Sequence, residues 1–341
     1  MTRCEAAEFV PPVGLRNPHV QSLLNSSGLR RRVAERRATH LLRHSEDILL
    51  DGGDGVRLLG HYSAHPGRQR PLAVLFHGWE GSAQSNYVLG TGARLYEDGF
   101  NVFRLNFRDH GDSHHLNPGV FHSCRLPEVV NALVDLQRRL AVPHWFLAGF
   151  SLGGNFALRV GLAAPSSGLS VRRIVAICPV IRPDRVLDQL ERGRGWYGRY
   201  FERKWGRSMR LKQAHWPDRY DYEEWFKLRG LRERTRFLAT EYYQYETLDQ
   251  YFDGYTIADD RLSSLTVPSL VLTAADDPVV PVSDFENLPE IPALEVRVAP
   301  YGGHCGFISS WRLDSWVESV ISNQFQAASE QESEQHDRPG D

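Results

Sequence analysis

The sequence predicts an α/β fold with a mostly parallel central sheet, flanking helices and an inserted helical lid. Short apolar runs recur along the chain with amphipathic stretches between most of them, which is typical of strands that alternate with helices. The run at residues 145–150 leads directly into a serine flanked by glycines, a pattern that indicates a strand, a sharp turn and a helix. Between residues 181 and 262 the alternation stops, over a stretch too long for an ordinary connection.

These elements divide the chain into an arm, a core, a lid and a tail. Residues 1–45 form an N-terminal arm that we expect to be irregular and partly basic. The core begins with an antiparallel hairpin, because two short runs flank the glycine-rich residues 52–55. The acidic tail is expected to be disordered, because it is polar and lacks apolar residues to bury. The core spans residues 46–180 and 263–328, the lid residues 181–262 and the tail residues 329–341, and the parallel strands are predicted at residues 72–76, 101–107, 145–150, 173–177, 269–273 and 295–298.

Composition excludes several classes of protein. The chain has 341 residues, 41% of them hydrophobic, which is enough for a sizeable core. A formal net charge of −2 argues against a nucleic-acid partner, and no apolar run approaches the roughly 18 residues of a membrane span. Glu5 and Glu8 lie where a signal peptide would have its apolar segment. The four cysteines lack C-x-x-C spacing, which favours free thiols, so we expect a cytoplasmic protein.

The turn after residues 145–150 presents a candidate nucleophile. Its sequence is Gly149-Phe150-Ser151-Leu152-Gly153, and a sharply bent backbone there leaves no room for side chains at the two glycine positions. The serine hydroxyl is then exposed at the start of the following helix. Ser151 is therefore the predicted nucleophile.

A base and an acid follow downstream, each in a loop just after a predicted strand. In the α/β-hydrolase fold the order along the chain is serine, acid, histidine, and His304 follows the last strand behind two glycines. Asp276 and Asp277 both follow the strand before it. We favour Asp277 because it directly precedes the Pro-Val-Val-Pro run, whereas Asp276 is better placed to cap the loop. His304 would take the proton of Ser151 during attack on an acyl carbonyl, and Asp277 would hold the imidazole.

A second glycine-containing turn, residues 77–81, is expected to complete an oxyanion hole. The backbone N–H groups of Leu152 and Trp79 are the predicted donors. His77, Gly78 and Phe150 are predicted to contact the substrate; in the alternative interpretation, His77 only ends its strand and braces the loop.

The lid is basic. Between residues 182 and 236 there are 16 Lys and Arg against nine Asp and Glu, a net charge of +7 (16 − 9). This charge could attract an anionic substrate or a peripheral contact with an anionic lipid surface. Alternatively it marks a solvated helical face on which arginine stems cover aromatic side chains, the interpretation we prefer.

Two other clusters carry a weaker chemical signal. Residues 108–115 hold Asp and His side chains that resemble a metal site, but no second cluster completes a ligand shell, and a loop contact near the site is favoured. Cys305 lies next to His304, yet Ser151 already fills the position of the nucleophile. We predict no metal and no cofactor.

The chain resembles the YheT-like α/β-hydrolases, also called the AB hydrolase type 4 family, which includes abhydrolase-domain esterases and phospholipases. The resemblance covers most of the chain and implies Ser151, Asp277 and His304 as the catalytic triad. Two departures put the shape of the acyl pocket in doubt: Arg108-Asp109-His110-Gly111 where the family tends to have Arg-Gly-x-Gly, and Cys124 where a glycine is usual. The motifs that carry the resemblance lie at residues 15–22, 77–82, 149–155, 251–256 and 302–307.

Together these features predict a serine hydrolase that cleaves carboxylic esters, either small-molecule or lipid esters, through an acyl-enzyme. An acyltransferase that passes the acyl group to an alcohol needs the same three side chains and stays open. A non-catalytic ligand-binding protein on a hydrolase scaffold is the third hypothesis, and the complete triad argues against it. Acyl chain length, head group and oligomeric state stay open.

Overall fold

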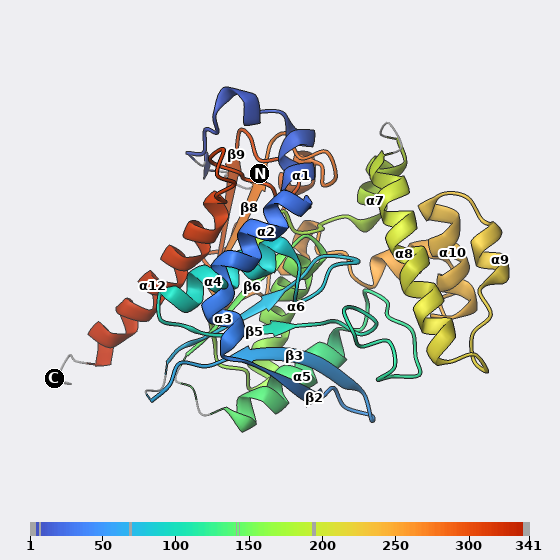
Figure 1. Ribbon diagram of the computed structural model, residues 1–341, viewed down its shortest axis with the longest axis horizontal. Helices are drawn as coiled ribbons and strands as arrows, with labels where there is room; N and C mark the ends of the chain where they lie inside the picture. Colours follow the sequence, from blue (N-terminus) through green and yellow to red (C-terminus); the bar gives the residue numbers. More distant parts are fainter. Residues whose placement is uncertain are drawn as a thin grey trace.

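The centre of the molecule is a nine-stranded sheet in the order β1-β9-β8-β7-β6-β4-β5-β3-β2 (Figure 1). The computed structural model describes residues 5–6, 8–67, 70–140, 142, 144–192 and 196–336. All neighbouring strands are parallel except β3, which is antiparallel to both β2 and β5. The strands are β1 (Glu5–Ala6), β2 (Ser45–Asp51), β3 (Arg57–Ser63), β4 (Leu72–Phe76), β5 (Asn101–Leu105), β6 (Trp145–Phe150), β7 (Val171–Ile177), β8 (Ser269–Ala274) and β9 (Leu294–Ala299).

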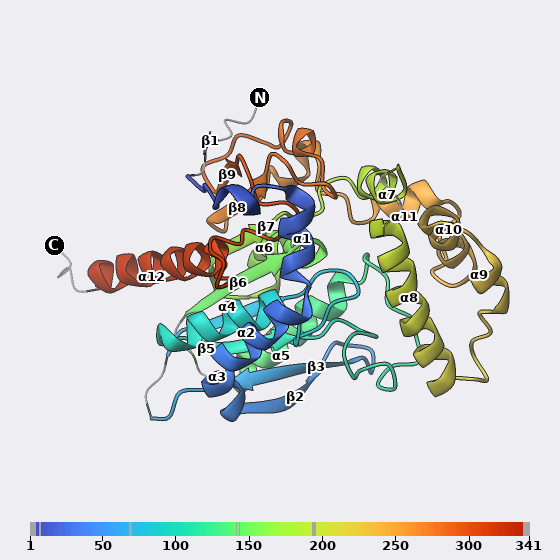
Figure 2. The ribbon, with the colours of Figure 1, turned by 45° about the horizontal axis from the view of Figure 1, so that its top comes forward.

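The predicted fold is confirmed, including the opening hairpin and all six parallel strands. The order of the strands is that of an α/β-hydrolase sheet with its edge hairpin, and helices cover both faces (Figures 1 and 2). Strand β5 ends at Leu105, two residues earlier than predicted. β1 was not predicted; it extends the sheet by pairing with β9.

Alternate residues of the central strands face two separate cores, as expected for a sheet buried on both faces. In β4, Val74 and Phe76 belong to the core that contains residues of α5 and α6, while Ala73 and Leu75 belong to the core that contains residues of α4 and α12. Strands β4, β5, β6 and β8 are buried along their whole length. The helices are α1 (Pro18–Asn25), α2 (Gly28–Arg37), α3 (Thr39–Arg43), α4 (Asn86–Glu97), α5 (Leu126–Arg139), α6 (Leu152–Ser167), α7 (Pro183–Arg192), α8 (Trp196–His215), α9 (Glu223–Lys227), α10 (Leu231–Glu241), α11 (Leu248–Asp253) and α12 (Trp316–His336), with 3-10 turns at Val13–Leu15, Asp259–Leu262 and Val282–Phe285.

The N-terminal arm is helical, and the expectation of an irregular segment was wrong. Helices α1, α2 and α3 follow one another, and α2 and α3 pack against α4. The side chains of Asn17 and Ser27 cap α1 and α2. The sequence hid α2 because its buried face consists of Arg30 and Ala34, and Arg30 is neutralised by an ion pair with Glu318 of α12. A buried ion pair leaves no apolar periodicity to detect.

The predicted lid segment contains α7 to α11, which stand together beside the sheet, on the side opposite the end of α12 (Figures 1 and 2). At the other end of the chain, α12 continues to His336, although we predicted disorder from residue 329. Residues 329–336 include three Glu and two Gln, which favour helix strongly. Residues 337–341 of the predicted tail lie outside the described residues.

Among the described residues, no helix is both long enough and apolar enough to cross a membrane. Cys124, Cys178 and Cys305 are free thiols, as predicted, and Cys4 lies outside the described residues.

Candidate active site

The turn after β6 holds Ser151 in a strained conformation. Its φ of 54° and ψ of −118° lie outside the regions that non-glycine residues favour. A Cβ on Gly149 would lie 2.1 Å from the carbonyl oxygen of Gly153, and a Cβ on Gly153 would lie 2.5 Å from that of His77. Only glycine fits at both positions, and the bend that results points the Ser151 side chain away from the sheet at the start of α6.

His304 connects Ser151 to an aspartate. Its Nε2 lies 2.9 Å from Ser151 Oγ, and its Nδ1 lies 2.9 Å from Asp277 Oδ2. A carboxylate only accepts, so Nδ1 carries a proton, and Nε2 can accept from the serine when the ring is neutral. Asp277 is fully buried, and its Oδ1 accepts from the N–H groups of Val279 and Val280 at 2.8 and 3.0 Å. Both oxygens of Asp277 are thus fixed.

The electrostatics of His304 favour its charged form. Burial by itself would lower the pKa of the imidazole, but the charge of Asp277, a thiolate at Cys305 and the hydrogen bond to Asp277 outweigh it and raise the pKa to about 9. An imidazolium formed when His304 takes a proton would therefore be stabilised where it stands.

Asp276 supports the histidine loop instead of the histidine itself. Its Oδ1 accepts from the N–H of Gly303 at 2.9 Å, which is the capping role that the sequence suggested for it. Burial raises the pKa of Asp276, opposed by this hydrogen bond. The adjacent aspartates thus contact different parts of one loop.

The N-terminal arm also holds this loop. Ser22 Oγ accepts from the N–H of His304 at 2.8 Å, and Asn25 donates to the carbonyl of Cys305 at 2.7 Å. Gln21 donates to the carbonyl of Ile308 at 3.1 Å and accepts from its N–H at 2.6 Å. No role was predicted for these three residues, although Gln21 and Ser22 end the family-specific motif at residues 15–22. The motif at residues 15–22 therefore packs against the motif at residues 302–307 and holds the histidine loop in place.

Two backbone N–H groups beside Ser151 have no partner among the described residues. Leu152 is the first residue of α6, so its N–H has no acceptor within the helix, and the N–H of Trp79 donates to no described protein group. A Cβ on Gly78 would lie 3.3 Å from the Cβ of Ser151, so the loop after β4 passes directly beside the serine.

The predicted contact of His77 with the substrate does not match its position in the structure. It was expected among the substrate-binding residues, but it is fully buried and does not line the cavity at Ser151. Its Nδ1 lies 2.8 Å from the carbonyl of Gly78, and its Nε2 accepts from the N–H of Phe107 at 3.2 Å. Burial lowers the pKa of His77 to about 4, so it is neutral. Of the two interpretations, its contacts match the second: it braces the loop from behind.

A cavity of about 720 Å³ opens over Ser151 and His304. Gly78, Trp79, Phe150 and Leu152 line it on the core side. The opposite wall comes from the lid. The indole of Trp79 stacks on Phe201 of α8, with ring centroids 5.1 Å apart, and meets Trp205 edge to face at 5.0 Å. The side chain of Trp79 thus packs against α8 of the predicted lid segment.

Two charged residues of this cavity were not predicted. Glu80 follows Trp79 with a φ of 54°, and Lys204 of α8 lines the same cavity. Burial raises the pKa of Glu80 to about 8, against the opposing charge of Lys204. The N–H of Glu80 donates to His110 Nε2 at 3.2 Å, which ties this loop to the one after β5. Glu80 lies within the family-specific motif at residues 77–82, which could have pointed to a role for it in the site.

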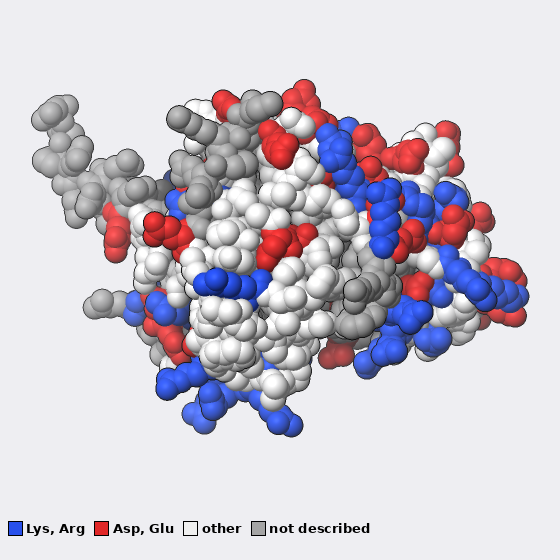
Figure 3. All heavy atoms as spheres, turned by 90° about the horizontal axis from the view of Figure 1, so that it is seen from above, with Lys and Arg blue, Asp and Glu red and all other residues white. Residues whose placement is uncertain are grey.

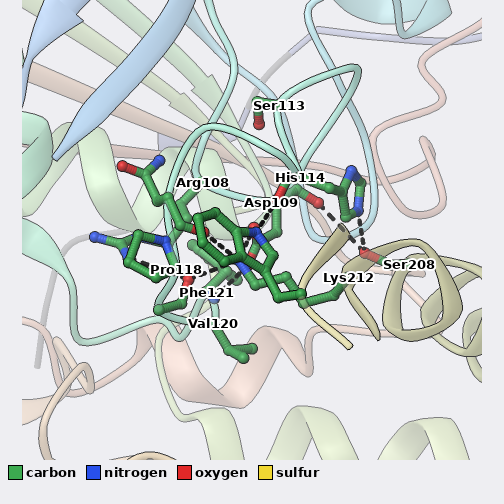
Figure 4. Close-up of polar contacts among 12 residues, drawn as sticks. Arg108, Asp109, Ser113, His114, Pro118, Val120, Phe121, Ser208 and Lys212 are labelled. Carbon is green, nitrogen blue, oxygen red and sulfur yellow. Dashed lines mark hydrogen bonds and ion pairs between the residues drawn. The ribbon is translucent and has the colours of Figure 1, made fainter. Parts of the chain in front are cut away.

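The loop after β5 carries a buried ion pair with the lid (Figure 4). Lys212 of α8 donates to Asp109 Oδ1 at 2.8 Å and to the carbonyls of Asn117 and Gly119 at 2.6 and 2.9 Å. Asp109 Oδ2 accepts from the N–H of Phe121 at 2.8 Å. Lys212 and Asp109 are only 1% and 5% exposed. The cluster that resembled a metal site thus serves, through Asp109, as an attachment for α8.

Most charges of the lid have partners. Seen from above, basic and acidic side chains are interspersed over this region (Figure 3). Arg210 lies over the ring of Phe226 at 4.5 Å, and Arg234 lies over that of Trp225 at 4.7 Å. This arrangement favours the interpretation in which arginine stems cover aromatic side chains. Ion pairs with acidic residues engage Arg182, Arg185, Arg192, Lys212, Lys227, Arg232 and Arg236.

Two residues of α6 connect the serine turn to the segment that ends the lid. Asn155 donates to the carbonyls of Val180 and Tyr255 at 2.9 and 2.8 Å. Arg159 donates to the carbonyl of Gly254 at 3.4 Å and to that of Ser123 at 2.8 Å. The motif at residues 251–256 therefore packs against the motif that contains Ser151.

The fold and a hydrogen-bonded serine–histidine–aspartate arrangement together define a class of protein. Residues 71–310 match the family described as alpha/beta hydrolase fold, and the chain belongs to that family.

Within it, the chain is similar to the candidate esterase YheT of Escherichia coli (strain K12), with 26% identity over 93% of this chain and 92% of that protein. It is 25% identical to phospholipase ABHD3 of Mus musculus, over 76% of this chain and 64% of that protein. The solved structure of the esterase Pf2001 of Pyrococcus furiosus shares the fold, with a TM-score of 0.55 and 16% identity over 96% of this chain and 98% of that one. The resemblance to the YheT-like α/β-hydrolases is thus confirmed.

Proposed function

We propose that this protein is a serine hydrolase that cleaves carboxylic esters, with Ser151 as nucleophile, His304 as general base and Asp277 as the acid that orients it. The observation that carries the proposal is the continuous hydrogen-bonded chain from Ser151 Oγ through both nitrogens of His304 to Asp277. Each distance is 2.9 Å, within the range in which a base takes a proton directly.

The reaction would proceed in two halves. Ser151 Oγ attacks the carbonyl carbon of the ester while His304 Nε2 takes its proton, and the same nitrogen then donates that proton to the departing alcohol. Water attacks the acyl-enzyme in the second half, again with His304 as base. Asp277 keeps the proton on Nδ1 and stabilises the imidazolium, a role that the raised pKa of His304 supports.

The oxyanion of the tetrahedral intermediate would bind the N–H groups of Trp79 and Leu152. Both are without an acceptor among the described residues, and both belong to loops that meet at Ser151. Fixed donors of this kind cost no reorganisation when charge develops, and losing one typically slows a hydrolase by about 10²- to 10³-fold.

The substrate class is an ester with an apolar acyl group, from a small molecule or a lipid. The cavity volume of about 720 Å³ falls in the range of sites for drug-sized ligands. Its lid wall is largely apolar and aromatic, including Leu187, Phe201 and Trp205. Curated relatives are named as esterases and as a phospholipase, which supports ester substrates of either kind.

Hydrolysis of p-nitrophenyl esters from acetyl to palmitoyl tests the proposal. Wild-type protein should turn over at least one chain length, and Ser151→Ala should abolish turnover while leaving the circular dichroism spectrum unchanged. Ser166→Ala is the matched control, because Ser166 is an exposed serine of the same helix whose hydroxyl contacts only a backbone carbonyl. Equal rates for Ser151→Ala and wild type would refute the serine mechanism.

A further inference from the structure

Two cysteines lie directly behind the proposed base. Cys178 follows β7 and Cys305 follows His304 in the chain; their sulfur atoms and a ring nitrogen of His304 all lie within 4.8 Å of one another. Both residues are buried, with 0% and 5% exposure. Neither sulfur belongs to a disulfide.

The two thiols differ in access and in acidity. Cys305 lines the cavity that contains Ser151, whereas Cys178 lies behind it against the carbonyl of Gly303, 3.9 Å from its sulfur. Burial opposes ionisation of Cys305, but the hydrogen bond from Cys178 and the charge of His304 outweigh it and lower the pKa of that thiol. Burial raises the pKa of Cys178, which therefore stays protonated. A small reagent that enters the cavity meets the more acidic sulfur first.

The backbone of both cysteines is held in place. Cys178 and Cys305 have φ values of 44° and 57°, so each adopts a left-handed conformation that only surrounding contacts maintain. The N–H of Cys178 donates to the carbonyl of Leu272 at 2.8 Å, and the carbonyl of Cys305 accepts from Asn25 at 2.7 Å. The sulfurs are thus kept facing each other.

We propose that Cys178 and Cys305 form a reversible disulfide on exposure to a peroxide, and that this bond switches the hydrolase off. The inhibition rests on the proposed function of His304, whereas formation of the disulfide does not. Cys124, the third described cysteine, lies against Tyr251 and Gly254.

The chemistry balances with hydrogen peroxide as the oxidant. The thiolate of Cys305 attacks one peroxide oxygen, so an S–O bond forms, the O–O bond breaks, and hydroxide leaves and is protonated to water. The sulfur of Cys178 then attacks the sulfenic sulfur; the S–S bond forms, the S–O bond breaks, and the departing hydroxide takes the thiol proton as a second water. Two thiols are oxidised by two electrons in total, and one peroxide is reduced to two waters.

Closure of this bond would displace the histidine. A disulfide needs its sulfurs about 2.0 Å apart, so the sulfurs must approach from a separation of up to 4.8 Å. Cys305 is covalently adjacent to His304, whose Nε2 must stay 2.9 Å from Ser151. Because a misplacement of about 1 Å costs on the order of 10²-fold in rate, we expect a loss of that size in kcat/KM.

The test treats the full chain with hydrogen peroxide and reads two signals. Peptide mass spectrometry without reductant should find Cys178 linked to Cys305, with the loss of two hydrogens, and this reading needs no substrate. Ester hydrolysis should fall by about 10²-fold and return after dithiothreitol. An absent Cys178–Cys305 peptide after peroxide treatment would overturn the proposal, as would a linked protein with unchanged activity.

Two variants separate the disulfide from general oxidative damage. Cys178→Ala removes the resolving thiol without altering the cavity lining, so its basal activity should equal that of wild type. Because this variant cannot form the disulfide, no linked peptide should appear after peroxide, and dithiothreitol should have no disulfide to reduce. Cys124→Ala is the matched control and should respond to peroxide as wild type does. Reversible inhibition of Cys178→Ala equal to that of wild type would contradict the switch. If neither wild type nor any variant hydrolyses esters, the proposed function fails while the mass spectrum still decides on the disulfide.

Discussion

Replacing Lys212 with methionine should destabilise the protein strongly, because Lys212 is the buried cation that attaches the lid to the core. Its ammonium group donates to Asp109 and to two backbone carbonyls, and its side chain is 1% exposed (Figure 4). Methionine matches the length of the stem but supplies no donor. The substitution therefore leaves the carboxylate of Asp109 and the two carbonyls inside the protein without this partner.

The size of the effect follows from these contacts. Removing one member of a buried ion pair typically costs about 3–5 kcal/mol, because the other charge stays buried without compensation. Asp109 can escape part of this cost by taking a proton, since burial already raises its pKa to about 6 even beside Lys212. We therefore expect Lys212→Met to lower the free energy of unfolding by about 3 kcal/mol at pH 7.

The destabilisation caused by Lys212→Met should depend on pH through the carboxyl group of Asp109. The pKa of Asp109 is raised in the folded protein, so the folded state binds its proton more tightly, and stability falls as the pH rises through the folded pKa. Loss of Lys212 raises this pKa further. The destabilisation should thus be smaller at pH 5 than at pH 8.

Urea unfolding of four proteins checks this reasoning: wild type, Lys212→Met, Asp109→Asn and the double variant. The double variant lacks the uncompensated charge, so it should be more stable than Lys212→Met, with a coupling energy of about 1–3 kcal/mol. Lys227→Met is the control, because Lys227 is an exposed lysine of the lid, and it should leave the midpoint unchanged. A stability of Lys212→Met within about 0.5 kcal/mol of wild type would refute the account of the lid attachment.

Four further predictions concern the site itself. Gly149→Ala should abolish ester hydrolysis, because its Cβ would lie 2.1 Å from the carbonyl oxygen of Gly153; wild-type activity in a folded variant would contradict the geometry of the turn. The value of kcat/KM should rise with pH through the pKa of His304, raised from 6.5 to about 9, because the base must be neutral. Asp277→Asn removes the charge that stabilises the imidazolium, so the acidic limb of the pH–rate profile should move to lower pH. The same variant should reduce kcat by about 10⁴-fold. An unmoved limb would show that Asp277 does not set the pKa of His304. Trp79→Ala should raise KM for long acyl chains more than it lowers kcat, since the stack on Phe201 is lost while the backbone N–H stays, and a fall in kcat alone would argue against the lid contact.

The sequence allowed the sheet, the serine turn and the positions of the acid and the histidine to be predicted, because each rests on local patterns. Buried strands appear as apolar runs, and the turn at Ser151 requires glycine at both flanks. Glycines at Gly302 and Gly303 likewise marked the loop that carries His304. These signals are read from a few consecutive residues.

What was missed depends on contacts between distant residues. Helix α2 buries Arg30 through its partner Glu318, which lies 288 residues away, so no apolar stripe reveals the helix. A loop contact was predicted for the segment that contains Asp109, but its partner could not be named, because Lys212 lies 103 residues away. His77 was assigned to the substrate because only packing shows that its ring faces Phe107 instead of the cavity. Pairs of buried charges and ring orientations are properties of the tertiary structure.

Covalent labelling tests directly whether Ser151 is a nucleophile activated by His304. A fluorophosphonate reacts only with a serine whose hydroxyl is activated by a base, and peptide mass spectrometry locates the adduct. We expect one adduct per chain, on Ser151. The adduct should be absent in Ser151→Ala and should form much more slowly in Asp277→Asn. A folded wild-type protein that stays unlabelled, or that carries the adduct on another residue, would contradict it.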